Sequence, residues 1–172
     1  MQVFLIRHPR PVIEPGVCYG RLDVDCHAPE TVAHPLRQRL PAGIAVHSSP
    51  SQRALRLARE LSPHAPVHID PRLSEIDFGA WEGRRWDAID RREIDAWAAD
   101  VLGFAPPGGE SVAVLQARAL DFAASLERDA AIVTHAGVMR ALVGYWQQLP
   151  AADWSRLEFA FGELVCLDVR QG

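Results

Sequence analysis

The residues of this sequence that are best suited to chemistry lie directly after short apolar segments. Arg7, His8 and His135 have this placement, and Arg53 stands in the first turn of the predicted helix that follows the second segment. The apolar segments that precede them span residues 3–6, 44–46 and 131–133. Open α/β sheets bind their ligands beyond the carboxyl ends of their parallel strands. We therefore expect the four side chains to meet at one edge of a sheet, where helix N-termini add N–H donors and partial positive charge.

This set of side chains matches the needs of phosphoryl transfer. A phosphoryl group in flight carries negative charge on its equatorial oxygens, so its transfer depends on positioning and electrostatic stabilisation. An arginine donates bidentately from a planar group that keeps its charge. A neutral imidazole, whose reference pKa is about 6.5, is an available nucleophile near neutral pH. The leaving alkoxide then needs a proton, which a carboxyl group can supply.

Alternating apolar segments and helical patterns predict the elements that position these residues. The predicted strands span residues 3–6, 44–46, 131–133 and 164–167, with a weaker one at 67–69. The predicted helices span residues 51–61, 111–127 and 137–146, and Ser51 and Ser111 are the expected N-caps of the first two. A helical pattern at 31–40 contains Pro35, so that helix is expected to be short or kinked. The order predicts an α/β fold, a three-layer α/β/α sandwich around a largely parallel sheet.

Length, charge and cysteine content restrict the class of protein. A chain of 172 residues suits a single domain, expected to span residues 1–172. The formal net charge of −4 argues against a nucleic-acid partner, because phosphate contacts need a basic face. No apolar stretch approaches the roughly twenty residues of a membrane span or forms a signal peptide. The three cysteines lack metal-ligand spacing and suit free thiols in a reducing cytoplasm. We expect a cytoplasmic protein with no membrane partner, and the oligomeric state stays open.

Four sequence blocks, in this order, resemble the motifs of the histidine phosphatase, or phosphoglycerate mutase-like, superfamily. They are Leu5-Ile6-Arg7-His8, the Ser48–Ala54 block, the Leu73–Gly83 block, and Val133-Thr134-His135-Ala136-Gly137. The resemblance covers nearly the whole chain. It implies a metal-independent phosphomonoesterase without a cofactor, whose partner is a small phosphorylated substrate.

The resemblance also implies roles for individual residues. His8 is the expected nucleophile, and Arg7, Arg53 and His135 are expected to bind the phosphoryl group. Glu75 is the expected general acid of the first half-reaction and general base of the second. Asp77 and Glu82 stand nearby in the same block, and the motif position favours Glu75 over both.

Further predicted substrate contacts are Gly20, Arg21 and Ala136. Arg21 has an equally open alternative, which is a simple ion pair with Asp23.

Some positions depart from the commonest family pattern and indicate a branch. Pro9, Pro11 and Glu14 stand where most members have Gly, then Ser or Thr, then Asn, and the mutase branch uses that polar pair. The run from Arg7 to Pro11, followed by Gly16–Asp23, looks more like the α-ribazole phosphatase branch of cobalamin synthesis. This likeness implies α-ribazole 5′-phosphate as the substrate. The alternatives are a protein phosphohistidine phosphatase, a phosphoglycerate-type mutase and a catalytically silent binding module.

The stretch at roughly 76–110 resembles the family's variable cap, which is expected over the edge of the sheet where the strands end. It contains Trp81, Trp86 and Trp97 and leads into the loop Pro106-Pro107-Gly108-Gly109. We hypothesise that these tryptophans form an apolar wall for the leaving group. Buried aromatic side chains more often fill a core, which is the alternative interpretation.

Overall fold

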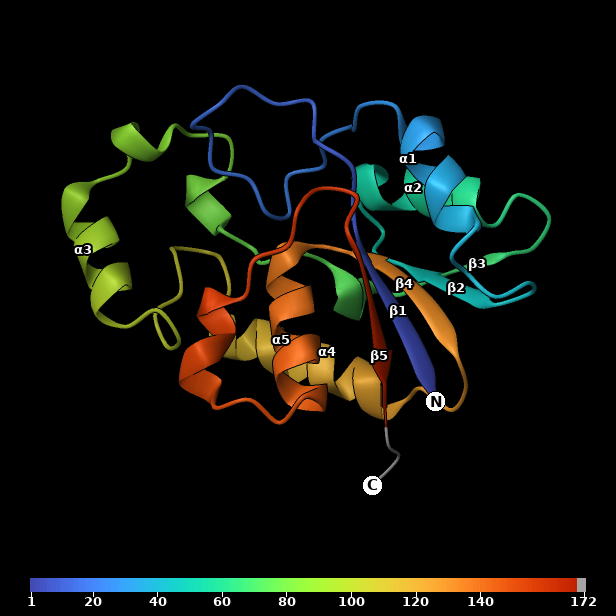
Figure 1. Ribbon diagram of the computed structural model, residues 1–172. Coiled ribbons are helices and arrows are strands. Elements are labelled where there is room, and N and C mark those ends of the chain that lie inside the picture. Colours follow the sequence, from blue (N-terminus) through green and yellow to red (C-terminus); the bar gives the residue numbers. More distant parts are fainter. Residues whose placement is uncertain (170–172) are drawn as a thin grey trace.

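The computed structural model describes residues 1–169, and a five-stranded sheet lies at the centre of that part of the chain (Figure 1). Its strands are β1 (Gln2–Arg7), β2 (Ala45–Ser48), β3 (Val67–Ile69), β4 (Ala130–Thr134) and β5 (Leu164–Asp168). They lie in the order β3-β2-β4-β1-β5, and of these five only β5 is antiparallel to its neighbour. All the predicted strands are present, and the prediction of a largely parallel sheet is confirmed.

The central strands β1 and β4 are buried on both faces, as their continuous apolar sequences predict. Successive side chains of a strand point to opposite faces. In β1, Val3 and Leu5 therefore belong to one apolar cluster, and Phe4 and Ile6 belong to another. The residues of β4 alternate between the same two clusters. The sheet thus separates two cores and fixes the direction of every strand end.

Helices cover both faces of the sheet (Figure 1). On one face lie α1 (Pro29–Arg37) and α2 (Gln52–Leu61). On the other lie α4 (Val112–Ala124) and α5 (Ala136–Trp146). The short α3 (Arg91–Ala99) lies away from the sheet. The predicted three-layer α/β/α sandwich is confirmed. In the part of the chain that the structure describes, no helix combines the length and apolar character needed to cross a membrane.

The two predicted serine caps have different outcomes. Ser111 caps α4 as expected, because its hydroxyl accepts the N–H of Val114 at 3.3 Å. Ser51 stands at the N-cap position of α2, but its side chain forms no cap hydrogen bond. The Oδ1 atom of Asp23 instead accepts the N–H of Gln52 at 2.7 Å. The expected side-chain cap by Ser51 is therefore wrong, and a residue distant in sequence supplies the acceptor.

Two helices are shorter than their periodicity predicts. Helix α1 ends at Arg37 and holds Pro35 in its last turns, which agrees with the expectation of a short helix. Helix α4 ends at Ala124, short of the expected boundary at 127. The hydroxyl and the N–H of Ser125 both donate to the carbonyl of Phe122, at 2.6 and 3.0 Å, and this closes the last turn.

Residues 76–110, called the cap segment below, extend to one side of the sandwich and include α3 (Figure 1). Several of their side chains form a small apolar cluster. Its buried members are Trp81 and Ile89 of the segment itself and Cys18 from the loop after β1. The two ends of the segment meet, because the N–H of Glu110 donates to the carbonyl of Asp77 at 2.9 Å. The cap segment therefore leaves the sandwich and returns to it at one place.

Candidate active site

The carboxyl ends of β1, β2 and β4 bring the predicted residues together. Arg7 pairs with Thr134 in the β1–β4 register, so the residues that follow, His8 and His135, are neighbours. Their ring centroids lie 5.0 Å apart with planes tilted by 59°. Strand β2 lies next to β4 and leads into α2, which carries Arg53 in its first turn. The sheet order thus assembles residues that are more than 120 positions apart in the sequence.

His8 is held as a neutral imidazole with one free nitrogen. Its side chain is 3% exposed, and Nδ1 lies 2.6 Å from the carbonyl oxygen of Pro9. A carbonyl only accepts, so this contact assigns the proton to Nδ1 and leaves the lone pair on Nε2. Burial, and then the charge of Arg53, lower the pKa of His8 to about 3. At neutral pH, Nε2 is therefore an unprotonated nucleophile.

Arg53 is a buried guanidinium held by backbone carbonyls. It is 0% exposed, and its Nη2 and Nη1 donate to Gly20 O at 2.5 Å and Leu22 O at 2.9 Å. Its Cζ lies 5.4 Å from the centre of the Tyr19 ring. Burial lowers the pKa of Arg53, and Glu75 is the first of the charges that oppose this shift. Carbonyl acceptors fix the group without neutralising it, so its charge stays available to an anion.

Arg7 and His135 are fixed in a similar way by neighbouring loops. Nη1 of Arg7 donates to Phe159 O at 2.5 Å, and its Cζ lies 3.9 Å from the centre of the Phe161 ring. His135 is 0% exposed, and its Nε2 lies 2.8 Å from Oγ of Ser49. Burial, followed by the charge of Arg53, lowers the pKa of His135 well below its ordinary value. His135 is therefore neutral at physiological pH.

Three nitrogens of this group have no hydrogen-bond partner. Among the described residues, Nε of Arg7, Nε of Arg53 and Nδ1 of His135 are the only buried side-chain nitrogen or oxygen atoms in that condition. Buried polar atoms in folded proteins are nearly always hydrogen-bonded, so an exception indicates a functional position. All three atoms belong to residues predicted to bind a phosphoryl group. Together they form a site suited to an anion with several acceptor oxygens.

Glu75 lies at the N-terminus of α5. Its Oε2 accepts the N–H of Gly137 at 3.1 Å, and its Oε1 accepts the N–H of Ile76 at 3.0 Å. Thr134 Oγ1 donates to Leu73 O at 2.7 Å and ties the segment of Glu75 to the end of β4. The side chain is half-buried and lines the cavity described below. Sequence reasoning placed this carboxyl group near the histidines, and the structure brings it there.

The competing carboxylates have structural partners. Glu82 accepts four backbone N–H groups, at 2.8 to 3.0 Å, from Gly20, Arg21, Leu22 and Phe78. It thereby fixes the loop whose carbonyls hold Arg53. Asp77 Oδ1 accepts the N–H of Gly79 at 2.8 Å, which stabilises a turn. Of the three carboxylates weighed from the sequence, Glu75 is the one that lines the cavity.

The remaining predicted contacts are placed as follows. Arg21 donates from Nε to Glu75 O at 3.2 Å, and its Nη2 lies 3.5 Å from Oε1 of Glu110. The alternative of an ion pair between Arg21 and Asp23 is wrong, because Asp23 caps α2 instead. Gly20 binds Arg53 through its carbonyl, and a Cβ at Gly20 would overlap Ile76 O.

Ala136 is the first residue of α5. The N–H of a first helical residue has no partner inside the helix. It therefore adds a donor at the edge of the site, beside His135.

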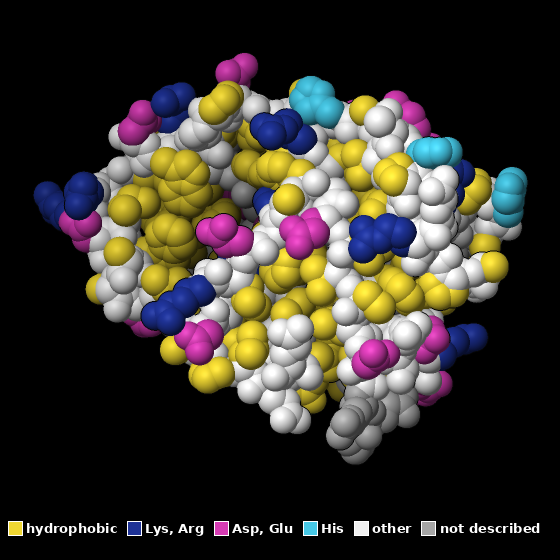
Figure 2. All heavy atoms as spheres, viewed as in Figure 1, with side chains coloured by type: hydrophobic (Ala, Val, Ile, Leu, Met, Phe, Trp, Pro, Cys, Tyr) yellow, Lys and Arg dark blue, Asp and Glu magenta, His cyan; other side chains and the backbone are white. Residues whose placement is uncertain are grey.

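An apolar cavity of about 430 Å³ opens beside Glu75. The cap segment, α4, α5 and the segment 151–155 contribute its walls; its aromatic members are Tyr19, Phe78, Trp97 and Trp154. Figure 2 shows hydrophobic side chains gathered in a hollow of the surface between the cap segment and the sandwich. Glu75 and Gly137, which lies two residues after His135, also line it. The cavity is therefore placed to receive the part of a ligand that extends away from the histidines.

The hypothesis that three tryptophans form this wall is wrong for two of them. Trp97 lines the cavity. Trp81 is fully buried in the cap cluster, where its Nε1 donates to Glu93. Trp86 stacks on Trp97 with ring centroids 5.9 Å apart and planes 12° apart. All three tryptophans belong to one aromatic cluster, so their spacing in the sequence could not show which of them lines the cavity.

Tyr19, Phe78 and Trp154 are wall residues that sequence reasoning did not assign to the site. Tyr19 lies in the Gly16–Asp23 run and Phe78 in the Leu73–Gly83 block, and these family-like segments could have indicated both residues. Trp154 comes from the segment before β5, and no sequence pattern indicated it.

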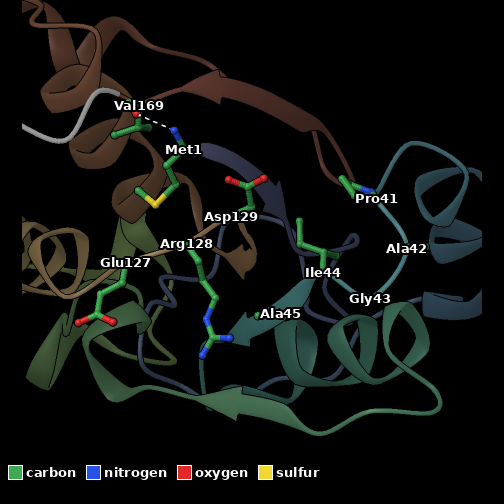
Figure 3. Close-up of a pocket in the computed structure, with 10 residues that line it drawn as sticks. All are labelled: Met1, Pro41, Ala42, Gly43, Ile44, Ala45, Glu127, Arg128, Asp129 and Val169. Atoms are coloured by element: carbon green, nitrogen blue, oxygen red, sulfur yellow. Dashed lines mark hydrogen bonds between the residues drawn. The ribbon is translucent and has the colours of Figure 1, made fainter.

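A larger depression, of about 970 Å³, lies at the opposite edge of the sheet (Figure 3). It is lined by the segment 41–45, by 127–129 and by both described chain ends, Met1 and Val169. These residues precede or begin β1, β2 and β4, or follow β5. None of the predicted site residues lies there, so size alone does not locate the chemistry.

The motifs and this geometry agree with a comparison of the whole chain with known families. The model of the histidine phosphatase superfamily (branch 1) matches residues 3–172. The chain therefore belongs to the histidine phosphatase superfamily, and it is a phosphatase of that family.

Relatives with assigned activities cover most of the chain. An adenosylcobalamin/alpha-ribazole phosphatase of Salmonella typhimurium is 25% identical, over 100% of this chain and 92% of its own length. A glucosyl-3-phosphoglycerate phosphatase of Mycolicibacterium vanbaalenii is 29% identical, over 89% of this chain and 77% of its own length. A 6-phosphofructo-2-kinase/fructose-2,6-bisphosphatase of Caenorhabditis elegans is 27% identical over 93% of this chain, which spans only 34% of that longer protein.

Solved structures show the same fold. The alpha-ribazole phosphatase from Shigella flexneri superposes with a TM-score of 0.89 at 28% identity, covering 99% of this chain and 92% of its own. A structure described as phosphoglycerate mutase from Thermus thermophilus has a TM-score of 0.77 at 33% identity, covering 98% of this chain and 93% of its own. These relatives agree on the family and differ in substrate.

Proposed function

We propose that this phosphatase hydrolyses a small phosphate monoester through a phosphohistidine formed on Nε2 of His8. The observation that carries the proposal is the group of three buried, unpartnered nitrogens on Arg7, Arg53 and His135 around that imidazole. In this proposal the Nε–H groups of Arg7 and Arg53 donate to the phosphoryl oxygens. Nδ1–H of His135 donates as well, in the tautomer whose Nε2 accepts the Ser49 hydroxyl. The two guanidinium charges balance the phosphate dianion.

The first half-reaction transfers the phosphoryl group to the enzyme. The Nε2 lone pair of His8 attacks phosphorus in line as the bond to the ester oxygen breaks. The hydrogen bond from Nδ1 to Pro9 O, at 2.6 Å, stabilises the positive charge that develops on the ring. Protonated Glu75 donates its proton to the leaving oxygen, so a neutral alcohol departs into the cavity. The result is a phosphohistidine beside an ionised Glu75.

The second half-reaction returns the enzyme to its starting state. Ionised Glu75 takes a proton from a water molecule that attacks phosphorus, the P–N bond breaks, and inorganic phosphate forms. His8 recovers its neutral imidazole, and Glu75 is again protonated. The two N–H groups that bind Glu75 keep its carboxyl group directed at the same position in both halves. In this scheme, arginine charges supply the electrostatic stabilisation and no metal ion takes part.

For the physiological substrate, we propose α-ribazole 5′-phosphate of cobalamin synthesis. The similarity to the Salmonella and Shigella phosphatases supports this choice. A cavity walled by Phe78, Trp97 and Trp154 also suits a flat, apolar leaving group. The departures at Pro9, Pro11 and Glu14 disfavour a mutase, and the cap segment disfavours a protein phosphohistidine phosphatase. In the proposal, residues 1–169 act with the rest of the chain as one domain, in a reducing cytoplasm that keeps the three cysteines free.

The proposed function is tested by trapping its intermediate. The wild-type protein is incubated with chelator and p-nitrophenyl phosphate, quenched in alkali and examined for an acid-labile phosphoryl group on His8. We expect turnover in chelator and a phosphohistidine that is absent from His8→Ala. Turnover that stops in chelator would contradict the metal-free mechanism, and turnover without any trapped adduct would contradict the role of His8. Phosphate transfer within one acceptor would identify a mutase instead. A lack of turnover on a broad ester panel would indicate a binding module.

A further inference from the structure

Against the backbone of Glu75 and Asp77 lies an ion pair that the mechanism above does not use. Arg118 of α4 and Glu110 at the end of the cap segment have side chains that are 15% and 12% exposed. Nη2 of Arg118 lies 2.5 Å from Oε1 of Glu110, and Nε lies 3.2 Å from Oε2. Both carboxylate oxygens therefore bind the same guanidinium, which is the bidentate geometry that fixes an arginine most firmly.

The other donors of Arg118 reach the backbone around Glu75. Nη1 donates to the carbonyls of Arg72 and Ser74 at 2.8 and 2.5 Å, and Nη2 donates to the carbonyl of Glu75 at 3.1 Å. The Arg118 guanidinium thus binds three carbonyls of residues 71–75, a stretch made of one helical turn (Pro71–Leu73) and the two residues after it. Backbone without a regular hydrogen-bond ladder needs such side-chain partners to keep one conformation.

Glu110 extends this arrangement to the far side of Glu75. Its Oε1 accepts the N–H of Asp77 at 3.1 Å, and its own N–H donates to Asp77 O at 2.9 Å. The Arg118–Glu110 pair therefore holds the backbone on both sides of the proposed acid. Glu110 is also the last residue of the cap segment. The same pair therefore fixes the end of that segment to the backbone of Glu75, the proposed acid.

We propose that Arg118, fixed by Glu110, is a positioning residue for Glu75, and this inference rests on the proposed function of Glu75 as acid and base. Proton transfer requires the carboxyl oxygen within hydrogen-bond reach of the leaving oxygen, and small misplacements reduce the rate steeply. A lysine at position 118 would keep the charge opposite Glu110. It would lack the planar fork that serves the carboxylate and the three carbonyls together.

The experiment compares two esters that differ in their need for an acid. Values of kcat/KM cover the steps up to release of the alcohol, so they report the first half-reaction. They are measured for p-nitrophenyl phosphate, whose leaving group departs readily, and for glycerol 3-phosphate, whose alkoxide needs a proton. The variants are Glu75→Gln, Arg118→Lys and Glu110→Gln. Arg72→Lys is the matched control. Arg72 stands on the same backbone stretch as Glu75, but its side chain pairs with Asp70 and with Asp121 of α4.

We expect Arg118→Lys to lower kcat/KM for glycerol 3-phosphate by about tenfold or more beyond its effect on p-nitrophenyl phosphate. Glu110→Gln should shift the same ratio in the same direction, and it serves as the second variant where Arg118→Lys does not fold. Arg72→Lys should leave the ratio unchanged. The affinity of Arg118→Lys for inorganic phosphate, measured by calorimetry, should also stay at the wild-type value, because Arg7 and Arg53 are untouched.

Two results would overturn the inference in different ways. A selective loss in Glu75→Gln together with equal losses for both esters in Arg118→Lys and Glu110→Gln would assign the ion pair to general stability alone. Equal losses for both esters in Glu75→Gln itself would overturn the proposed acid, and the positioning role would fall with it.

Discussion

The backbone N–H of Gly137 donates to Oε2 of Glu75 at 3.1 Å, and there is no room for a side chain between them. A Cβ built on Gly137 would overlap Oε1 of Glu75 and lie 3.2 Å from Cδ1 of Leu115. The close approach places the carboxyl group at the N-terminus of α5, where the helix contributes partial positive charge. Glycine is thus required at position 137 because a side chain would displace the Glu75 carboxyl group. The backbone conformation at this position does not require glycine.

Gly137→Ala tests this relationship. The helix preference of alanine over glycine, up to roughly 1 kcal/mol, opposes the loss of the Glu75 hydrogen bonds, so the melting temperature should change little. The methyl group should nevertheless displace the Glu75 carboxyl. We expect kcat/KM for an alkyl phosphate to fall by about a hundredfold, with a smaller loss for p-nitrophenyl phosphate. Steady-state kinetics and thermal unfolding check the two halves of this prediction. Wild-type kinetics in a folded variant would contradict it.

The sequence predicts the edge of the sheet that carries this site because strand order and residue type are local signals. His8 and His135 each follow an apolar run, and parallel neighbours must end at the same edge. The capping of α2 by Asp23 could not be predicted, since the acceptor belongs to a loop whose course depends on Glu82 and Arg53. The partners of Arg21 could not be predicted for the same reason, because they also come from segments distant in the sequence.

Tyr19→Phe should weaken catalysis without weakening the fold. The Tyr19 ring lies near Arg53 and lines the cavity, and its hydroxyl has no hydrogen-bond partner within residues 1–169. Burial raises the pKa of Tyr19, so the hydroxyl stays a donor at physiological pH. We expect it to donate to the bound phosphate ester. Hydrogen bonds to charged groups contribute about 1.5–3 kcal/mol, which corresponds to a loss of roughly ten- to a hundredfold in kcat/KM.

The other tyrosine of the chain supplies the control for that prediction. Tyr145 is 49% exposed on α5, and Tyr145→Phe makes the same chemical change outside the cavity. Its kinetics should match the wild type. Equal kinetics of Tyr19→Phe and Tyr145→Phe would show that the Tyr19 hydroxyl does not contact the substrate.

The low pKa of His8 makes the stability of the fold depend on pH in a definite direction. The folded-state pKa of His8 is about 3, below the ordinary value of 6.5. The unfolded chain therefore binds more protons between these values, so this contribution is present above about pH 6.5 and is lost as the pH falls toward 3. His8→Asn should make the free energy of unfolding less dependent on pH in this window, by up to about 1.4 kcal/mol per pH unit.

Denaturant unfolding at several pH values measures this slope. His64→Asn is the control, because its side chain is exposed and folding does not bury it. The wild type and His64→Asn should lose stability in parallel on acidification, while His8→Asn should lose less. Parallel curves for all three proteins would contradict the burial of a neutral His8.

The cavity walls show where sequence reasoning reached its limit. The aromatic content of residues 76–110 indicated an apolar surface, and the structure supplies one. The aromatic side chain that faces the cavity is selected by packing between Trp81, Trp86 and Trp97. Sequence periodicity cannot predict this packing, because the segment contains only one short α-helix. Trp154 joins the wall from a distant segment through tertiary contact alone.

The stacked pair of Trp86 and Trp97 allows the leaving-group role of the cavity to be separated from the stability of the cap segment. Trp97→Leu and Trp86→Leu both remove one partner of the same stack, but only Trp97 lines the cavity. Aromatic contacts contribute about 0.5–1.5 kcal/mol beyond buried area, so Trp97→Leu should lower kcat/KM for a bulky aromatic ester by up to about tenfold. Trp86→Leu should lower it less, although both variants should lose similar thermal stability. A small ester such as glycerol 3-phosphate should be hydrolysed equally well by both. Equal losses on the aromatic ester would mean that the cavity does not contact the leaving group.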